Sequence, residues 1–150
     1  MKVLISRRYF IGGIVTLVAL AALPFKLLAR AAKAFEAEDI DVVYRELFGD
    51  MPIIESQDIK LKIPEIAENG AVVPVSISTS ISGVEAIYVV IDENPNPLSA
   101  SFQLGPSTPA DISVRVKMGR SSMVRALIKT SDKVYMKGQE VKVTIGGCGG

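Results

Sequence analysis

Histidine is absent from this 150-residue sequence, cysteine occurs once, and there is no tryptophan. Without histidine, the chain cannot form a Ser-His-Asp or Cys-His nucleophile pair, nor a metal site with histidine ligands. A single cysteine excludes an intramolecular disulfide and a zinc site built from several cysteines. We therefore expect no catalytic residue, no metal site and no cofactor, which favours a carrier that works with partner enzymes over a self-sufficient enzyme.

The one cysteine lies close to the end of the sequence, between two pairs of glycines: Gly146, Gly147, Cys148, Gly149 and Gly150. Glycine loses the most backbone entropy on ordering, so this segment predicts a flexible arm that reaches on the order of 10 Å past the last strand. An odd cysteine in an exported protein indicates an intermolecular bond or a reactive thiol. A free thiol is mostly protonated at neutral pH, so we expect the enzyme that receives the arm to activate it.

The first residues have the features of an export signal. The paired arginines Arg7 and Arg8 precede residues 9–25, which carry no charge, and small residues follow. A basic start, an apolar middle and small residues at the end are typical of a cleaved signal peptide, and the arginine pair indicates the twin-arginine route. We expect cleavage after Ala31 or Ala34 and a periplasmic location. The alternative, an uncleaved anchor, would be short for a bilayer.

A short helix is predicted directly after this signal. Apolar residues recur at helical spacing over residues 35–48, and Gly49 follows as a natural stop. The expected apolar stripe consists of Ile40, Val43, Tyr44, Leu47 and Phe48. This stripe predicts a face packed on the domain or on a partner rather than a cofactor site.

The rest of the chain alternates apolar and polar residues in short runs separated by Gly, Pro, Asn and Ser, which predicts antiparallel strands. The expected strands cover residues 59–63, 73–78, 86–91, 99–104, 112–118, 123–130, 134–136 and 141–145. Their number favours a mainly β fold, an immunoglobulin-like antiparallel β-sandwich with a short N-terminal helix and a flexible C-terminal arm. Pro74 predicts that its strand lies at a sheet edge, and residues 92–97 predict a structural turn.

These predictions divide the chain into four parts. The parts are a signal peptide (residues 1–34), a helix (residues 35–49), a sandwich domain (residues 50–145) and the arm (residues 146–150).

Charge is unevenly distributed along the chain. Residues 35–111 hold 14 acidic and 3 basic residues, whereas residues 112–150 hold 2 acidic and 8 basic ones. The eight basic residues are Arg115, Lys117, Arg120, Arg125, Lys129, Lys133, Lys137 and Lys142. They either guide anionic partners toward Cys148, or they pair with the acidic strands of the same domain or are solvated beside them, and we favour the second interpretation. The acidic balance after the signal argues against nucleic-acid binding.

Three segments resemble the SoxY family, the sulfur carriers of the thiosulfate-oxidising Sox system. They are residues 141–150 (VKVTIGGCGG), residues 124–126 (VRA) and residues 94–102 (NPNPLSASF). The resemblance implies that sulfur intermediates are bound covalently at Cys148. It implies thiosulfate coupling by a c-type haem enzyme (SoxXA-like), sulfate release by a hydrolase (SoxB-like) and, where present, oxidation by a sulfane dehydrogenase (SoxCD-like). It also implies a heterodimer with a SoxZ-like subunit.

Two other functions are compatible with the sequence. One is a ubiquitin-like sulfur carrier activated at the carboxylate of Gly150, although that chemistry needs cytoplasmic ATP and this chain carries an export signal. The other is a secreted adhesion-like sandwich that Cys148 merely dimerises. Replacing Cys148 tests the first alternative, and the masses of its adducts test the second.

Overall fold

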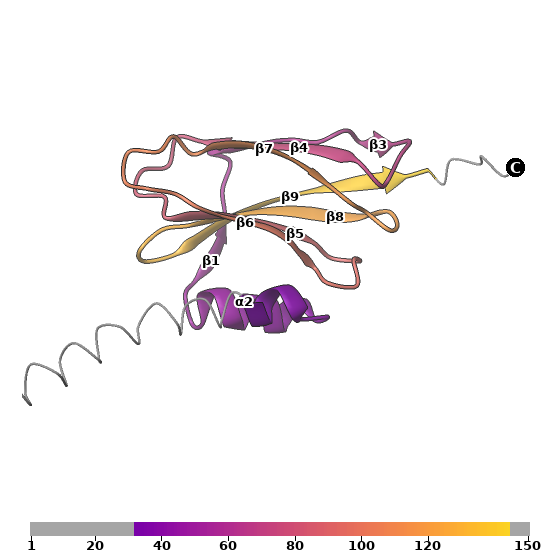
Figure 1. Ribbon diagram of the computed structural model, residues 1–150. Coiled ribbons are helices and arrows are strands. Elements are labelled where there is room, and N and C mark those ends of the chain that lie inside the picture. The colour runs from indigo at the N-terminus through magenta and orange to yellow at the C-terminus, as the bar shows by residue number, and fades with distance from the viewer. Residues whose placement is uncertain (1–31, 145–150) are drawn as a thin grey trace, which may run out of the picture.

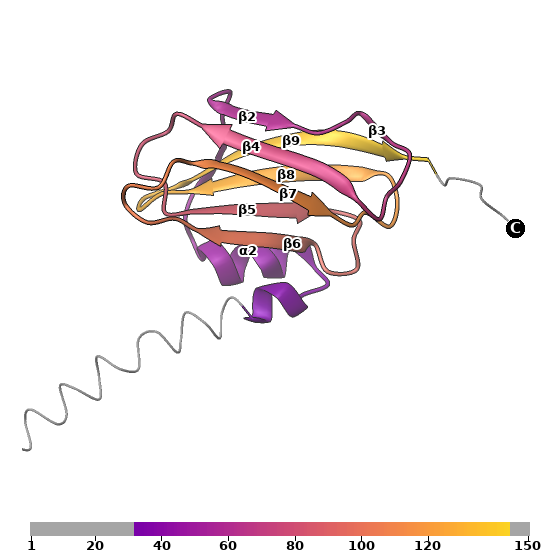
Figure 2. The same ribbon diagram turned by 45° about the horizontal axis from the view of Figure 1, so that its top comes forward.

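The computed structural model describes residues 32–144. Two β-sheets lie face to face, and a helix covers the other face of the larger sheet (Figure 1; Figure 2). The elements are α2 (Ile40–Phe48), β1 (Ile53–Glu55), β2 (Ile59–Lys62), β3 (Ile66–Ala67), β4 (Val73–Thr79), β5 (Ala86–Ile91), β6 (Leu98–Gln103), β7 (Asp111–Val116), β8 (Ser122–Lys129) and β9 (Val134–Val143).

The larger sheet has the strand order β1-β9-β8-β5-β6, and β3 also pairs with β9. The smaller sheet has the order β2-β4-β7. The β1 and β3 strands run parallel to β9, and the other pairs of the described residues are antiparallel. The predicted sandwich is therefore confirmed, with two short parallel strands added along one edge of β9.

The β5 strand lies in the middle layer, between the smaller sheet and α2, and all six of its residues are buried. Ile87 and Val89 belong to the core between the two sheets. Tyr88 and Val90 belong to a second core, between the larger sheet and α2. Since successive side chains of a strand point to opposite faces, burial on both faces requires an unbroken apolar run.

The predicted apolar stripe of the helix is confirmed, and it packs on the domain's own sheet. Val43 and Phe48 are buried in the second core, where the Phe48 ring meets Tyr88 edge-on at 5.3 Å between centroids. Gly49 ends the helix as predicted, with a φ of 60° that favours glycine. None of the helices in the described chain is long and apolar enough to cross a membrane.

The start of the helix differs from the prediction of residue 35. A separate helical turn covers residues 32–36, and α2 begins only at Ile40. Asp39 interrupts the helix because its backbone is extended. It is the N-cap of α2, and its carboxylate accepts a hydrogen bond from the N–H of Asp41 at 2.7 Å. Asn96 holds the preceding turn by donating to the carbonyl of Glu36 at 3.1 Å.

The last strand also differs from the prediction, because residues 134–136 and 141–145 were expected as two strands. The described β9 is one strand of ten residues, from Val134 to Val143. The centre of this strand is polar, which interrupts the apolar alternation. Gly138 leaves room there for the sulfur of Met123, which would lie 3.0 Å from a Cβ added to Gly138.

The prediction that the strand of Pro74 lies at a sheet edge is wrong. The β4 strand is central in its sheet, but its pairing with β2 stops at Ser76. At Pro74 only β7 is paired, through Arg115. The missing N–H of proline is tolerated because β4 is unpaired on its other side at this point.

Candidate functional site

The predicted site residues lie outside the described part of the chain. This holds for Cys148 and its four glycine neighbours, and equally for the signal residues Arg7 and Arg8. The structure describes the base from which the arm extends, which is the end of β9 and the last described residue, Thr144 (Figure 1).

Hydrogen bonds fix one edge of β9 up to its end. The N–H of Lys142 donates to the carbonyl of Glu65 at 2.9 Å, and the N–H of Thr144 donates to the carbonyl of Ala67 at 3.1 Å. Side chains alternate as predicted, with Val141 buried and Lys142 and Thr144 exposed. The pairing with β3 therefore holds the backbone as far as the fourth residue before the cysteine.

The other edge of β9 is held by the loop of residues 117–121. The N–H of Val143 donates to the Oγ of Ser121 at 2.9 Å. Next to it, the N–H of Met118 donates to the carbonyl of Gly70 at 2.7 Å. A Cβ on Gly70 would lie 2.5 Å from the carbonyl oxygen of Met118 and 2.9 Å from Cγ1 of Val143, so this close contact requires glycine.

The turn of residues 92–97 supports the same end of the domain. The side chain of Asn94 donates to the carbonyl of Lys117 at 2.8 Å and accepts from the N–H of Gly119 at 3.3 Å. These bonds confirm the interpretation of this acidic segment as a structural turn.

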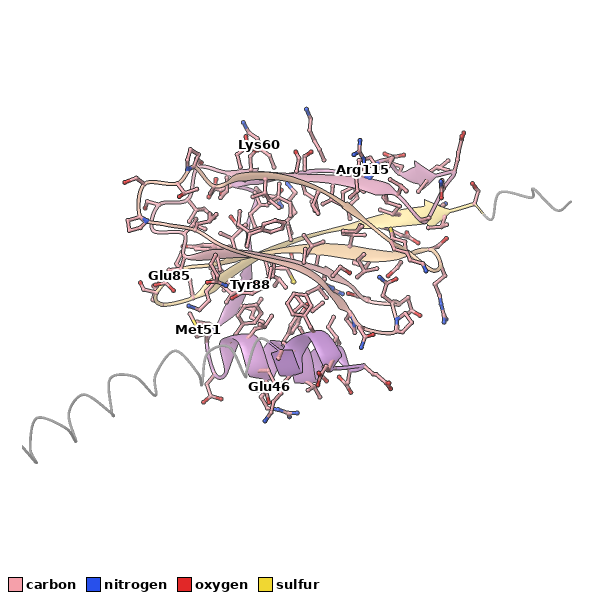
Figure 3. The ribbon with its side chains drawn as sticks, in the orientation of Figure 1. Glu46, Met51, Lys60, Glu85, Tyr88 and Arg115 are labelled. Carbon is pink, nitrogen blue, oxygen red and sulfur yellow. The ribbon has the colours of Figure 1, made fainter. Side chains whose placement is uncertain are left out.

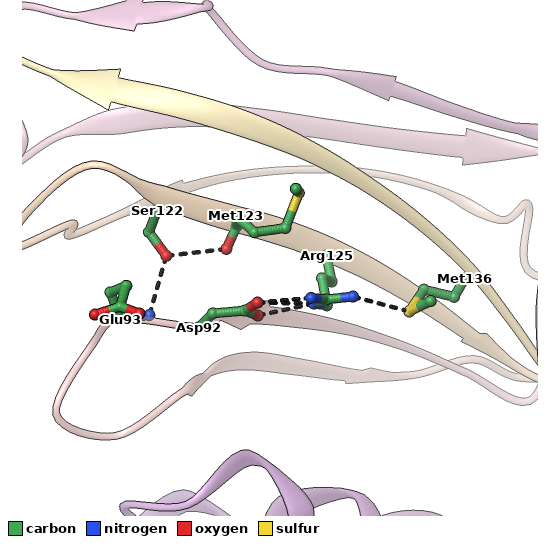
Figure 4. A network of polar contacts seen from close by, with 6 residues as sticks. All are labelled: Asp92, Glu93, Ser122, Met123, Arg125 and Met136. Atoms are coloured by element: carbon green, nitrogen blue, oxygen red, sulfur yellow. Dashed lines mark hydrogen bonds and ion pairs between the residues drawn. The ribbon is translucent and has the colours of Figure 1, made fainter.

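A partly buried polar network lies between the larger sheet and α2 (Figure 4). Arg125 binds Asp92 through Nε at 2.8 Å and through Nη2 at 2.7 Å, and its Nη1 lies 3.6 Å from the sulfur of Met136. The hydrogen bond to Asp92 raises the pKa of the Arg125 guanidinium, which keeps the charge in place. Burial raises the pKa of the Tyr44 hydroxyl close by.

Four of the eight basic residues after residue 111 form ion pairs. The pairs are Arg125 with Asp92 at 2.7 Å, Lys129 with Glu85 at 2.5 Å, Lys133 with Asp132 at 3.3 Å and Arg120 with Glu93 at 3.5 Å. Three of the acidic partners belong to the acidic part of the chain, so the predicted pairing is confirmed for these residues. By contrast, Arg115 and Lys60 project from the outer face of the smaller sheet (Figure 3).

Sequence reasoning missed the residues that hold the base of the arm. Asn69 and Gly70 indicate a turn, but nothing in the sequence shows that Gly70 touches Val143. Ser121 looks like an ordinary loop serine, although it binds the end of β9. Among the described residues, no group of three acidic, cysteine or histidine side chains is placed to hold a metal ion.

Comparisons with known proteins point to one family. The family model of the sulfur oxidation protein SoxY matches residues 44–148. One similar solved structure is that of the sulfur carrier protein SoxY from Chlorobium limicola f thiosulfatophilum, which is 39% identical, with a TM-score of 0.66. The match covers 71% of this chain and 97% of the Chlorobium chain. The superoxide reductase (neelaredoxin) from Ignicoccus hospitalis is 16% identical, with a TM-score of 0.53 and coverage of 59% and 81%, which shows a shared fold alone. No curated protein sequence matches.

Proposed function

The chain belongs to the SoxY family of sulfur oxidation proteins, and on this premise we propose that its thiol at Cys148 carries the sulfur covalently. The observation that carries the proposal is the family match, which extends to Cys148 itself. The geometry described above supports it, because β9 is hydrogen-bonded on both edges until four residues before the thiol.

The proposed cycle begins with an oxidative coupling. The Cys148 thiolate and thiosulfate form a sulfur–sulfur bond, which yields a cysteine S-thiosulfonate and releases two electrons to a c-type haem enzyme (SoxXA-like). Water then attacks the terminal sulfonate in a hydrolase (SoxB-like), which breaks the bond to the inner sulfur. That step releases sulfate and two protons and leaves a persulfide on Cys148. Where a sulfane dehydrogenase (SoxCD-like) is present, it oxidises the persulfide sulfur.

The chain itself supplies no catalytic group to this cycle in our proposal. The sandwich holds and presents the arm, while the partner enzymes activate the thiol and perform the redox chemistry. Cys148 is the fourth residue after Thr144, so it lies at most about 14 Å from the end of the held backbone. Each enzyme must therefore admit the arm into its own active site.

We propose a heterodimer with a SoxZ-like subunit. The apolar stripe of the helix was predicted to pack on the domain or on a partner. The stripe residues Val43 and Phe48 are buried against the larger sheet, so the helix stripe is not available to this subunit. We propose the outer face of the smaller sheet as the contact surface, from which Lys60 and Arg115 project (Figure 3).

A chain that ends after Ile145 tests the proposed function. We expect it to fold with an unchanged melting temperature, because both described cores lie within residues 34–143. We expect no thiosulfate-dependent oxygen uptake when it replaces the full chain in its host. Uptake at the rate of the full chain would contradict the proposal.

Export by the twin-arginine route to the periplasm is also proposed, with cleavage after Ala31. The support is Ala34, which is fully buried in the core beneath α2 and is lost from the domain if cleavage occurs after it. We expect N-terminal sequencing of the exported protein to begin at Ala32. A start at Phe35 would contradict the cleavage site, and an intact Met1 would contradict cleavage.

A further inference from the structure

The short arm limits where an enzyme can approach. If Cys148 is the carrier thiol, as proposed above, an enzyme that acts on it must bring its active site within about 14 Å of Thr144. Folded enzymes enclose their active sites, so the rim of the entrance then lies against the end of the sandwich where β9 ends. We call this end, formed by residues 65–72, 92–97 and 117–121, the arm end.

Two of the four large apolar side chains that are exposed in the described residues lie at the arm end. These two, Ile66 (57%) and Val72 (49%), have the highest exposed fractions of the four. Ile66 lies in β3 directly opposite Lys142 of β9. Val72 ends the turn that starts after β3 and precedes the first residue of β4 (Figure 2).

Both side chains lie close in sequence to residues that pack on the domain. Next to Ile66, the side chain of Ala67 is buried in the core between the two sheets. Two residues before Val72, Gly70 packs on Met118 and Val143. Ile66 also borders a shallow depression along β9, which is lined by Glu65, Ile66, Gln139, Glu140 and Lys142. Apolar side chains beside packed residues can bind a partner at a lower ordering cost than side chains on a flexible segment.

Charge does not distinguish the arm end, because acidic and basic residues balance there. The acidic residues in its segments are Glu65, Glu68, Asp92 and Glu93, and the basic ones in or bonded to them are Lys117, Arg120, Arg125 and Lys142. Two of these pairs are closed ion pairs within the domain. Exposed charges that are already paired add little to binding, so the apolar side chains remain as the feature that a partner can recognise.

We propose that Ile66 and Val72 form a docking surface for the rim of the active-site entrance in the enzymes that process sulfur on Cys148. The rim has an apolar patch that covers these two side chains while the glycine arm enters. Because several enzymes must accept the same arm in turn, a small apolar contact gives each of them recognition with fast release.

The experiment compares three variants of the full exported chain: Ile66→Ser, Val72→Ser and Ile54→Ser. Ile54 is a matched control, because it is 42% exposed and lies in β1, which also pairs in parallel with β9, opposite Tyr135. Tyr135 is the seventh residue before Lys142 in β9, which places the control about 23 Å farther from the arm. Each variant is mixed with thiosulfate and a periplasmic extract of host cells that lack this chain and were exposed to thiosulfate while growing on another energy source. Intact-mass spectrometry then follows adduct formation on Cys148 as the chain concentration is varied.

We expect Ile66→Ser and Val72→Ser to raise the half-saturating chain concentration by about fivefold to tenfold each, as removal of a half-exposed aliphatic contact predicts. The Ile54→Ser chain behaves like the unchanged chain. The melting temperatures and the rate of Cys148 alkylation by iodoacetamide stay the same in all three variants, because exposed substitutions change stability little.

Four results would overturn the inference. The first is unchanged half-saturation in Ile66→Ser and Val72→Ser, and the second is an equal rise in Ile54→Ser. The third is weakened binding of a copurified partner subunit, or a changed oligomeric state, which would identify that subunit or a second copy as the occupant. The fourth is a half-saturating concentration that rises steeply with salt, which would assign recognition to charge. Complete absence of adducts on the unchanged chain would instead overturn the proposed function.

Discussion

Cys148→Ser is expected to abolish thiosulfate oxidation in cells that depend on this chain. A hydroxyl is hardly ionised at neutral pH, and it cannot form the sulfur–sulfur bond on which each proposed intermediate depends. Thiosulfate-dependent oxygen uptake should fall to the rate of cells that lack the chain. The measurement is uptake by a deletion strain that carries the variant gene, with the unchanged gene as reference.

The control for this variant is its fold. Cys148 lies four residues beyond the last described residue, and both described cores lie within residues 34–143. We therefore expect the free energy of unfolding to stay within about 0.5 kcal/mol of the unchanged chain. Full activity of the serine variant would contradict the proposal and favour activation at the carboxylate of Gly150, as in a ubiquitin-like carrier.

Gly70→Ala is expected to lower the free energy of unfolding by about 2–4 kcal/mol, which corresponds to roughly 10 °C in melting temperature. The added Cβ would lie 2.5 Å from the carbonyl oxygen of Met118, a backbone atom that the 2.7 Å hydrogen bond to Gly70 holds in place. To relieve this overlap, the turn that contains Gly70 must move away from Val143 of β9 and from Met118. Thermal unfolding followed by circular dichroism measures the change.

Gly119→Ala is the matched control for that substitution. Gly119 lies at the same end of the domain, but a Cβ there meets nothing within 4 Å, and its φ is not positive. We expect its melting temperature to match that of the unchanged chain. Equal melting temperatures of the Gly70→Ala and Gly119→Ala chains would show that the close packing beside Val143 is not a determinant of stability.

The sandwich was predictable because most of its strands show their burial in the sequence. In β4 the apolar residues Val73, Val75 and Ile77 alternate with polar ones, and they face the core as predicted. The β5 strand is apolar throughout because it is covered on both faces. The stripe of α2 follows the same logic at helical spacing.

The edge of β9 was not predictable from local pattern. The β1 and β3 strands have three and two residues, and each exists only because β9 offers a free edge there. Such pairing depends on residues that are distant in sequence, as between Ile53 and Val134. For the same reason β9 continues through its polar centre, where apolar alternation fails.

In the candidate site too, some features follow from the sequence and others depend on the fold. Cys148 and its glycine neighbours stay a prediction from residue type and position, because they lie outside the described residues. The surface that presents them was not predictable, because a contact such as that of Gly70 with Val143 is a property of the folded chain. The exposure of Ile66 was hidden as well, since Ile66 and Ala67 are adjacent apolar residues and local pattern does not show which of the two faces the core.

The most direct test of the central claim is the mass spectrum of this chain from cells grown on thiosulfate. The account predicts a series of sulfur-bearing adducts on the peptide that contains Cys148, including the S-thiosulfonate and the persulfide, which disappear after treatment with a reducing agent. An unmodified thiol, or a disulfide dimer without any such adduct, would contradict the claim that Cys148 carries the sulfur.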